Sequence, residues 1–256
     1  MGGETRMKWN RLSSPQLDTL DRALPVILPT GSTEQHGPHL PIGTDLMIVD
    51  HLCSLIDQAI EKEVLILPSL SVTCSKHHMD FPGSLTLSHE TYAASALEIL
   101  ESVHSHGFKN FLLFNSHGGN TAINTVIMER FGNHNPDCHV ASTNWYTVAA
   151  ESLAEIRESP PGGVGHAGEF ETSLMMVITP DLVDASSLPE RGNNSTFPWS
   201  EADMLEGSKA KLHRTMKQMT DNGVFGDPGY ASVDKAHRIE QAVLEHIVPL
   251  IKDLKI

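Results

Sequence analysis

The sequence predicts an α/β fold in which helices cover both faces of a mostly parallel central sheet. Short apolar runs alternate with segments of helical periodicity through the first half of the chain, which is typical of such sheets. The chain has 256 residues, of which 39% are hydrophobic, and this is enough for a sizeable core. Because no repeat or convincing linker interrupts the pattern, we expect one domain over residues 1–256.

Strands are expected where short apolar runs are bounded by turn-forming residues. The first run, LPVILP, is enclosed by prolines and is typical of a buried strand. The runs VLILPSL, FKNFLLFNS and CHVAST have a similar character. The expected strands are residues 24–29, 64–70, 108–116 and 138–143.

Helices are expected between and after these strands. The segment 46–63 has apolar residues at helical spacing, namely Leu46, Val49, Cys53, Ile56 and Ile60. A helix over 89–107 has Ser88 as a candidate cap and is ended by Gly107. The other expected helices are 121–132, 144–158, 168–179, 201–219 and 233–254.

Charge and composition exclude several classes of protein. The formal net charge of −14 argues against nucleic acid or an anionic membrane as a partner, because both would repel the chain. No apolar run approaches the length of a membrane span, and no signal-peptide pattern is found. The three cysteines are scattered and fit a reducing compartment, so we expect a cytoplasmic protein.

Three polar motifs occur where the predicted topology can bring them together. GSTEQHGPHLPIGTD (31–45) follows the first strand, and NSHGGN (115–120) follows the third. In parallel sheets, ligands bind outside the carboxyl ends of the strands, so both motifs should lie at the same edge. A third motif, GHAGEFET (165–172), opens a later helix and can join them.

The side chains of these motifs indicate a metal site. Imidazole and carboxylate ligands without sulfur suit Zn, Mn or Fe(II), and the chain contains 15 histidines. Two metals that share a bridging carboxylate can hold a hydroxide nucleophile and polarise a carbonyl oxygen. Each motif alone is equally typical of a surface loop or a helix start, and only their combination predicts a metal-dependent hydrolase. The candidate ligands are Glu34, His36, Asp45, His117 and a glutamate of the third motif.

Five motifs in a fixed order resemble the creatininase (creatinine amidohydrolase) family. They are LPTGSTEQHGPHLPIGTD, FPGSLTLS, FNSHGGN, HAGEFETSLMM and GDPGYAS. The resemblance implies a three-layer αβα sandwich around a parallel sheet and a dinuclear metal centre. It also implies hydrolysis of a C–N amide bond in a small or cyclic substrate, and a hexamer arranged as a trimer of dimers.

The resemblance also assigns roles to individual residues. Glu34 and His117 would hold one metal, His36 would hold the other, and Asp45 would bridge the two. His166 matches the catalytic histidine of the family, which carries a proton beside the metals. Creatininase has a metal-binding glutamate at the position of Gly119. Glu169 is therefore expected to replace it, with Glu171 in a supporting role, and the two exchange roles if the helix turns Glu171 inward.

The expected substrate contacts are less specific. His78 is expected to face the pocket, although KHH is also typical of a surface segment, and Trp145 is a candidate apolar wall. His39 is expected either to contact the metal ligands without binding a metal itself, which we favour, or to be a turn residue. Creatininase has a tryptophan at the position of Gly162, so creatinine itself is not the expected substrate.

Two other classes of function remain open from the sequence. A dinuclear phosphoesterase would use similar ligands, but no glycine-rich phosphate cradle or arginine cluster accompanies the motifs. A metal-binding scaffold without catalysis is the other alternative, and His166 argues against it because pure binding needs no proton carrier.

Overall fold

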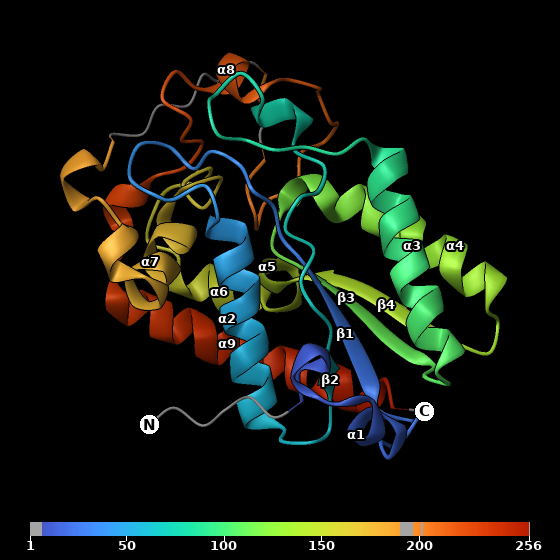
Figure 1. Cartoon of the computed structure of the whole chain (residues 1–256). Helices are drawn as coiled ribbons and strands as arrows, with labels where there is room; N and C mark the ends of the chain where they lie inside the picture. Colours follow the sequence, from blue (N-terminus) through green and yellow to red (C-terminus); the bar gives the residue numbers. More distant parts are fainter. Residues whose placement is uncertain (1–6, 190–196, 201, 256) are drawn as a thin grey trace.

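The central sheet has four parallel strands in the order β2-β1-β3-β4 (Figure 1). The computed structural model describes residues 7–189, 197–200 and 202–255. The strands are β1 (Pro25–Thr30), β2 (Leu65–Ile66), β3 (Asn110–Asn115) and β4 (His139–Asn144). All four lie within or next to the expected ranges, and the fold class predicted from the sequence is confirmed.

Alternate side chains of the strands face two separate hydrophobic cores. Ile27 and Leu112 point into one core, whereas Val26 and Leu113 point into the other, as the period of two in a strand requires. Every residue of β1 and β3 is buried, so both faces of the sheet are covered.

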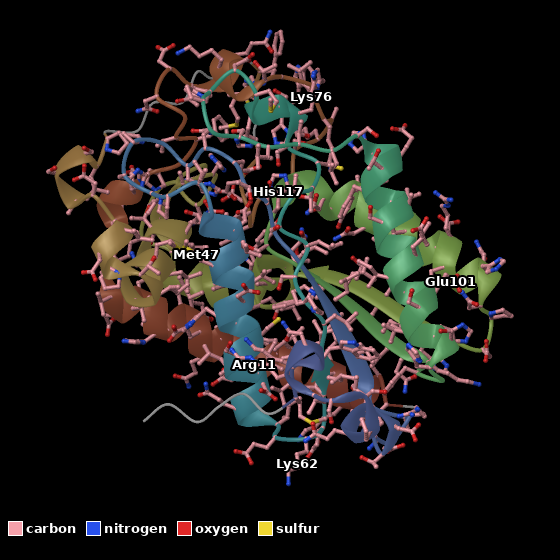
Figure 2. All side chains as sticks on the ribbon, viewed as in Figure 1. Arg11, Met47, Lys62, Lys76, Glu101 and His117 are labelled. Atoms are coloured by element: carbon pink, nitrogen blue, oxygen red, sulfur yellow. The ribbon has the colours of Figure 1, made fainter. Side chains whose placement is uncertain are left out.

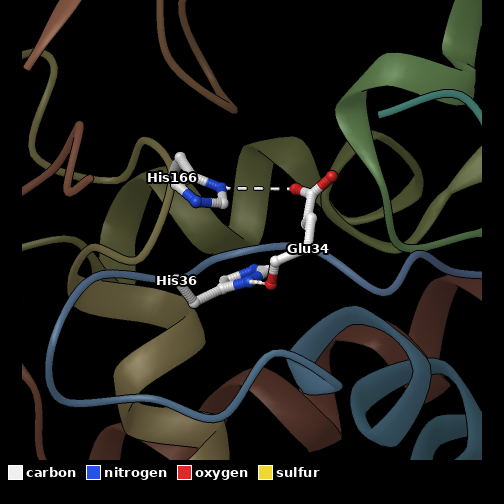
Figure 3. Close-up of side chains that lie close together, drawn as sticks. All are labelled: Glu34, His36 and His166. Carbon is white, nitrogen blue, oxygen red and sulfur yellow. Dashed lines mark hydrogen bonds and ion pairs between the residues drawn. The ribbon is translucent and has the colours of Figure 1, made fainter. Parts of the chain in front are cut away.

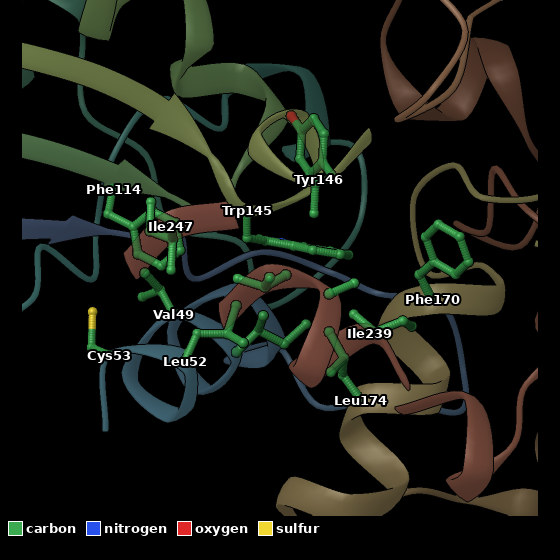
Figure 4. Packing of buried hydrophobic residues seen from close by; sticks show 14 of the residues in the cluster. Val49, Leu52, Cys53, Phe114, Trp145, Tyr146, Phe170, Leu174, Ile239 and Ile247 are labelled. Atoms are coloured by element: carbon green, nitrogen blue, oxygen red, sulfur yellow. The ribbon is translucent and has the colours of Figure 1, made fainter. Parts of the chain in front are cut away.

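Helices on the two faces complete a three-layer αβα arrangement (Figure 1). One face carries α2, α5, α6, α7 and α9, and the other carries α3 and α4, with α1 beside them. The bounds are α1 (Ser14–Asp18), α2 (Thr44–Ala59), α3 (His89–Ser105), α4 (Thr121–His134), α5 (Trp145–Val148), α6 (Ala150–Ile156), α7 (Glu169–Ile178), α8 (Met216–Met219) and α9 (Val233–Asp253). Figure 4 shows part of the first core, where Trp145 and Phe114 lie near α2 and α9.

Two helix predictions differ from the structure. The expected helix 144–158 is divided into α5 and α6 at Ala149. The expected helix 201–219 is wrong, because only α8 is helical among its described residues. The Asp203 carboxylate accepts hydrogen bonds from the backbone of Leu205 and Glu206 at 2.9 and 2.8 Å, and such local bonds compete with a helix.

The strand order places the polar loops at one point of the sheet. The chain leaves β1 toward β2 on one side, and it leaves β3 toward β4 on the other. The carboxyl ends of β1 and β3 therefore form a topological switch point, where ligands bind in open α/β sheets. Short 3₁₀ turns, among them η2 (Lys76–His78), η3 (Gly118–Asn120) and η6 (Pro228–Tyr230), surround it. No helix in the described part of the chain has the length and apolar character of a membrane span.

Candidate metal centre

Buried asparagines fix the backbone around His117 at the carboxyl end of β3. The Asn115 side chain accepts hydrogen bonds from the His117 backbone and from Thr30, at 3.2 and 2.9 Å. Asn120 donates to the Gly31 carbonyl at 3.1 Å, which ties the third-strand loop to the first-strand loop. The polar residues of NSHGGN therefore set the position of His117, which Figure 2 shows beyond the end of the sheet.

His117 faces two carboxylates. Its Nδ1 lies 3.1 Å from both Glu34 Oε1 and Asp45 Oδ2. Its Nε2 lies 3.1 Å from the carbonyl oxygen of Cys74, to which it donates, so Nδ1 is the atom available to a metal. All three side chains are buried. The expectation that the first two motifs lie together is met by this geometry.

A second group of ligand atoms shares Asp45 with the first. His36 Nε2 lies 3.3 Å from Asp45 Oδ1 and 3.7 Å from Glu171 Oε2. His36 Nδ1 donates to the carbonyl of Glu34 at 3.1 Å, which directs Nε2 toward the carboxylates. One oxygen of Asp45 faces each group, as a carboxylate between two metals would.

The pKa values of this cluster indicate that its buried carboxylates need positive charge nearby. Burial raises the pKa of Glu171 to about 7. Burial acts against charge on His36 too, but the carboxylates of Asp45 and Glu171 prevail and raise its pKa to about 9. Buried carboxylates are stable only beside such charge.

The donor set fits divalent metals. Three buried atoms of the described site, Glu34 Oε2, His36 Nε2 and Asp45 Oδ2, have no well-formed hydrogen bond, although ionic groups lie near the last two. The ligand atoms are imidazole nitrogens and carboxylate oxygens, which suit Zn or Mn. A metal would take the place of the protons on His36 and His117.

Glu169, the expected last ligand, lies outside both ligand groups, whereas Glu171 lies in one of them. The carboxylate of Glu169 lies 2.5 Å from Lys235 Nζ and accepts from the backbone of Glu158 and Ser159 at 2.9 and 3.0 Å. The physical reason is helix register: residues two positions apart point in nearly opposite directions. Glu171 therefore faces the cluster while Glu169 faces α9.

Figure 3 shows His166 beside Glu34. The turn that carries His166 is supported by GDPGYAS, because the Asp227 amide donates to the Gly163 carbonyl at 2.8 Å. The Nε2 of His166 donates to the Gln35 carbonyl at 2.7 Å, and Nδ1 lies 3.6 Å from Glu34 Oε1. Its backbone pairs with Phe225, and the next residue, Ala167, has φ of +53°, a strained conformation typical of functional turns. Burial and the nearby His36 lower the pKa of His166 well below its usual range, so its ring is neutral.

His78 is a buried part of the site rather than a surface histidine. It lies in η2, and its Nε2 is 3.2 Å from Glu34 Oε1. Gln35 Nε2 lies 3.1 Å from His78 Nδ1, to which it can donate, and also 3.1 Å from His166 Nε2. The sequence analysis missed Gln35, although it stands between two predicted ligands in EQH.

Trp145 does not face the pocket. It is 0% exposed and packs against Tyr146 and Phe170 in the hydrophobic core, so its role as a substrate wall is corrected (Figure 4). Tyr146, the next residue, lines the pocket instead. His39 is buried and its Nε2 lies 2.9 Å from Thr172 Oγ1, so it contacts the residue that follows Glu171.

The two ligand groups form the floor of a cavity of about 370 Å³. This is within the range of about 300–1,000 Å³ that small-molecule sites occupy. His77, His78 and Tyr146 line it, together with Phe225, Ser200 and several of residues 202–219. Candidate metal ligands and a neutral histidine in one pocket are typical of a hydrolytic site.

Comparison with known proteins decides the family. The family model described as creatinine amidohydrolase matches residues 10–251. The chain belongs to the creatininase family. A solved structure of creatinine amidohydrolase (creatininase) superposes with a TM-score of 0.82 at 20% identity, over 96% of this chain and 97% of that one. Solved creatininase structures also include a Zn–Zn form and a Mn form.

Relatives in this hydrolase family act on different substrates. The chain is 27% identical to a mycofactocin precursor peptide peptidase of Mycobacterium tuberculosis, over 87% of this chain and 82% of that protein. It is 22% identical to a 3-dehydro-scyllo-inosose hydrolase of Thermotoga maritima, over 90% of this chain and 77% of that protein. Membership of the creatininase family therefore establishes a hydrolase fold but leaves the substrate to the pocket of this chain.

Proposed function

We propose that this protein is a metal-dependent amidohydrolase that cleaves a C–N amide, formamide or cyclic amide bond of a small molecule. The observation that carries the proposal is the pair of ligand groups that share Asp45, next to the neutral ring of His166. A scaffold without catalysis would have no use for an imidazole that is held in one tautomer beside the ligands.

The proposed metal ligands form two sets. Glu34 and His117 would hold one divalent ion, and His36 and Glu171 would hold the other, with Asp45 between them. When bound, such ions lower the pKa of a water molecule and polarise the carbonyl oxygen of the substrate. We propose two Zn, Mn or Fe(II) ions per chain.

His166 is proposed to carry the proton that amide cleavage requires. Because Nε2 donates to the Gln35 carbonyl, Nδ1 holds the free lone pair and faces Glu34. It can take one proton from water as the hydroxyl adds to the carbonyl carbon. It can then give that proton to the leaving nitrogen as the C–N bond breaks, so that a neutral amine departs.

The test of this proposal combines a panel of small amides with one variant. The wild type, loaded with Zn or Mn, should release amine from at least one formamide, acetamide or cyclic amide. His166→Ala should keep both metals and its fold, and its kcat should fall by about 10²–10⁴-fold. His134→Ala, which changes an exposed histidine of α4, is the matched control. Hydrolysis of phosphoesters with none of the amides would refute the proposal.

The proposal also covers the assembly and the location of the protein. We propose a homo-oligomer, a hexamer built as a trimer of dimers, on the basis of the family resemblance. The three cysteines are free thiols in the structure, which supports a reducing compartment such as the cytoplasm.

A further inference from the structure

A basic segment stands out in this acidic chain. Residues 209–217, KAKLHRTMK, contain four of the 18 lysine and arginine residues and no acidic residue. The chain as a whole has 32 aspartate and glutamate residues and a net charge of −14. None of the proposed metal ligands or His166 lies in this segment, so the proposed function leaves its charge unexplained.

The fold places this segment over the candidate metal centre. At its carboxyl end, α8 packs on η2, the turn that carries His78. Lys217 Nζ lies 5.2 Å from the centre of the Phe81 ring, which fixes that end of the segment. Figure 1 shows α8 beyond the carboxyl end of the sheet, on the side where the loops of the site emerge.

Two cations of the segment line the cavity. Lys211 and Arg214 belong to its wall, whereas Lys209 and Lys217 lie outside the lining. Lys211 is exposed and Arg214 is half-buried. Asp203 lines the same cavity, but Arg157 lies 3.5 Å from its carboxylate, which also accepts the Gly162 amide.

The lining of the cavity therefore combines two kinds of charged group. The carboxylates and histidines of the proposed metal site belong to it, and so do the cations Lys211 and Arg214. Apolar side chains complete the lining, including Met204, Leu212, Met216, Met219 and Phe225. A ligand that fills the cavity meets the metal ligands, apolar contacts and cations.

We propose that the substrate carries an anionic group, a carboxylate or a phosphate monoester, away from its scissile C–N bond, and that Arg214 and Lys211 bind it. The inference rests on the proposed amidohydrolase function. The planar guanidinium of arginine matches the oxygen pairs of carboxylates and phosphates, and lysine adds a point charge. Binding of the anionic group would position the scissile amide of the substrate relative to the proposed metal ligands.

The test uses matched pairs of substrates that differ in the anionic group. On the metal-loaded protein, N-formylleucine is compared with N-formylleucinol, and N-formylethanolamine phosphate with N-formylethanolamine. The wild type should have the larger kcat/KM on the anionic member of at least one pair. The pair that shows the preference identifies the group as carboxylate or phosphate.

The variants Arg214→Gln and Lys211→Gln then test whether these two side chains cause the preference for the anionic substrate. Arg214→Gln should lower kcat/KM on the anionic substrate by about 10- to 100-fold, since hydrogen bonds to charged groups are among the strong ones. The loss should lie mainly in KM, and turnover of the neutral partner should be unchanged. Lys209→Gln removes a nearby charge outside the lining and should leave both substrates unaffected.

The outcomes separate this inference from the proposed function. Equal use of the charged and neutral members by the wild type overturns the inference, as does an equal loss on both members in Arg214→Gln. If no formamide is cleaved, the proposed function fails for formamide substrates. The anion site is then tested by binding measurements alone. Calorimetry with 4-methylpentanoate and ethyl phosphate should then show weaker binding in Arg214→Gln. Unchanged binding means that the metals hold the anion and overturns the inference.

Discussion

Two glutamates of α7 that are separated by one residue should respond in opposite ways to the same substitution. Glu169 pairs with Lys235, and Glu171 faces His36 and Asp45. We predict that Glu169→Gln lowers the stability of the fold and keeps the metals. We predict that Glu171→Gln loses metal and keeps the stability of the metal-free fold.

The size of the first effect follows from burial. The side chain of Lys235 is 2% exposed and that of Glu169 is 0% exposed, so the substitution leaves a buried ammonium without its closest carboxylate. Breaking such a pair costs about 3–5 kcal/mol. Lys235 still donates a hydrogen bond to the Tyr230 carbonyl at 2.6 Å, so we expect a cost of about 3 kcal/mol. With a shift of about 2–4 °C per kcal/mol in chains of this size, Tm should fall by roughly 6–12 °C.

The second effect has the opposite sign for the metal-free protein. Burial raises the pKa of Glu171 to about 7 from its ordinary 4.5. A carboxyl group with a raised pKa stabilises the fold while it is protonated, and that contribution is lost as the pH rises from 4.5 through 7. At pH 8 glutamine avoids this cost, which is at most roughly 3 kcal/mol. The metal-free variant should therefore melt at or above the wild-type temperature.

The assay is a set of thermal melts at pH 8 with a chelator, together with elemental analysis of protein loaded with Zn or Mn. The expected pattern is a lower Tm with full metal for Glu169→Gln, and an unchanged or higher metal-free Tm with reduced metal for Glu171→Gln. If Glu169→Gln loses metal as readily as Glu171→Gln, the assignment from helix register is refuted.

Two further predictions concern the ligand groups. Asp45→Asn should reduce the bound metal from two ions per chain to one or fewer by elemental analysis, because both groups share this carboxylate, whereas the exposed Asp18→Asn should keep both. Gly119→Ala should weaken metal binding by about 10–100-fold in a chelator competition, as loss of support around a ligand typically does. The new Cβ would lie 2.3 Å from His117 Nε2, whereas the nearest atom to a Cβ at Gly118 is 3.8 Å away, so Gly118→Ala should bind metal normally.

The strands and the place of the site could be predicted because local signals are strong there. Prolines and glycines bound the apolar runs, and parallel strands bring the loops after β1 and β3 to one edge. Glu34, His36, Asp45 and His117 lie in these loops or at the start of the next helix, so their convergence follows from topology alone.

The remaining features depend on packing that the sequence does not display. The choice between Glu169 and Glu171 depends on which face of α7 meets α9, and Lys235 lies far away in the chain. Trp145 and Tyr146 are neighbours, and only the core decides which one faces the pocket. Residues 201–219 have a helical composition, but several of the described residues 202–219 line a cavity instead of presenting one apolar stripe to a core.

The ligand set and the proton carrier of this site are coupled by one turn. Glu171 accepts a hydrogen bond from the Ala167 amide at 2.6 Å, and the positive φ of Ala167 turns His166 toward Glu34. On the opposite side, Gly119 has no room for a carboxylate, because a Cβ there would lie 2.6 Å from the Cys74 carbonyl. This crowding supports the proposal that the last ligand comes from α7, and the carboxylate of Glu171 holds the backbone next to His166. A change that moves this ligand should also move the proton carrier, so metal affinity and kcat should vary together among variants of residues 163–171.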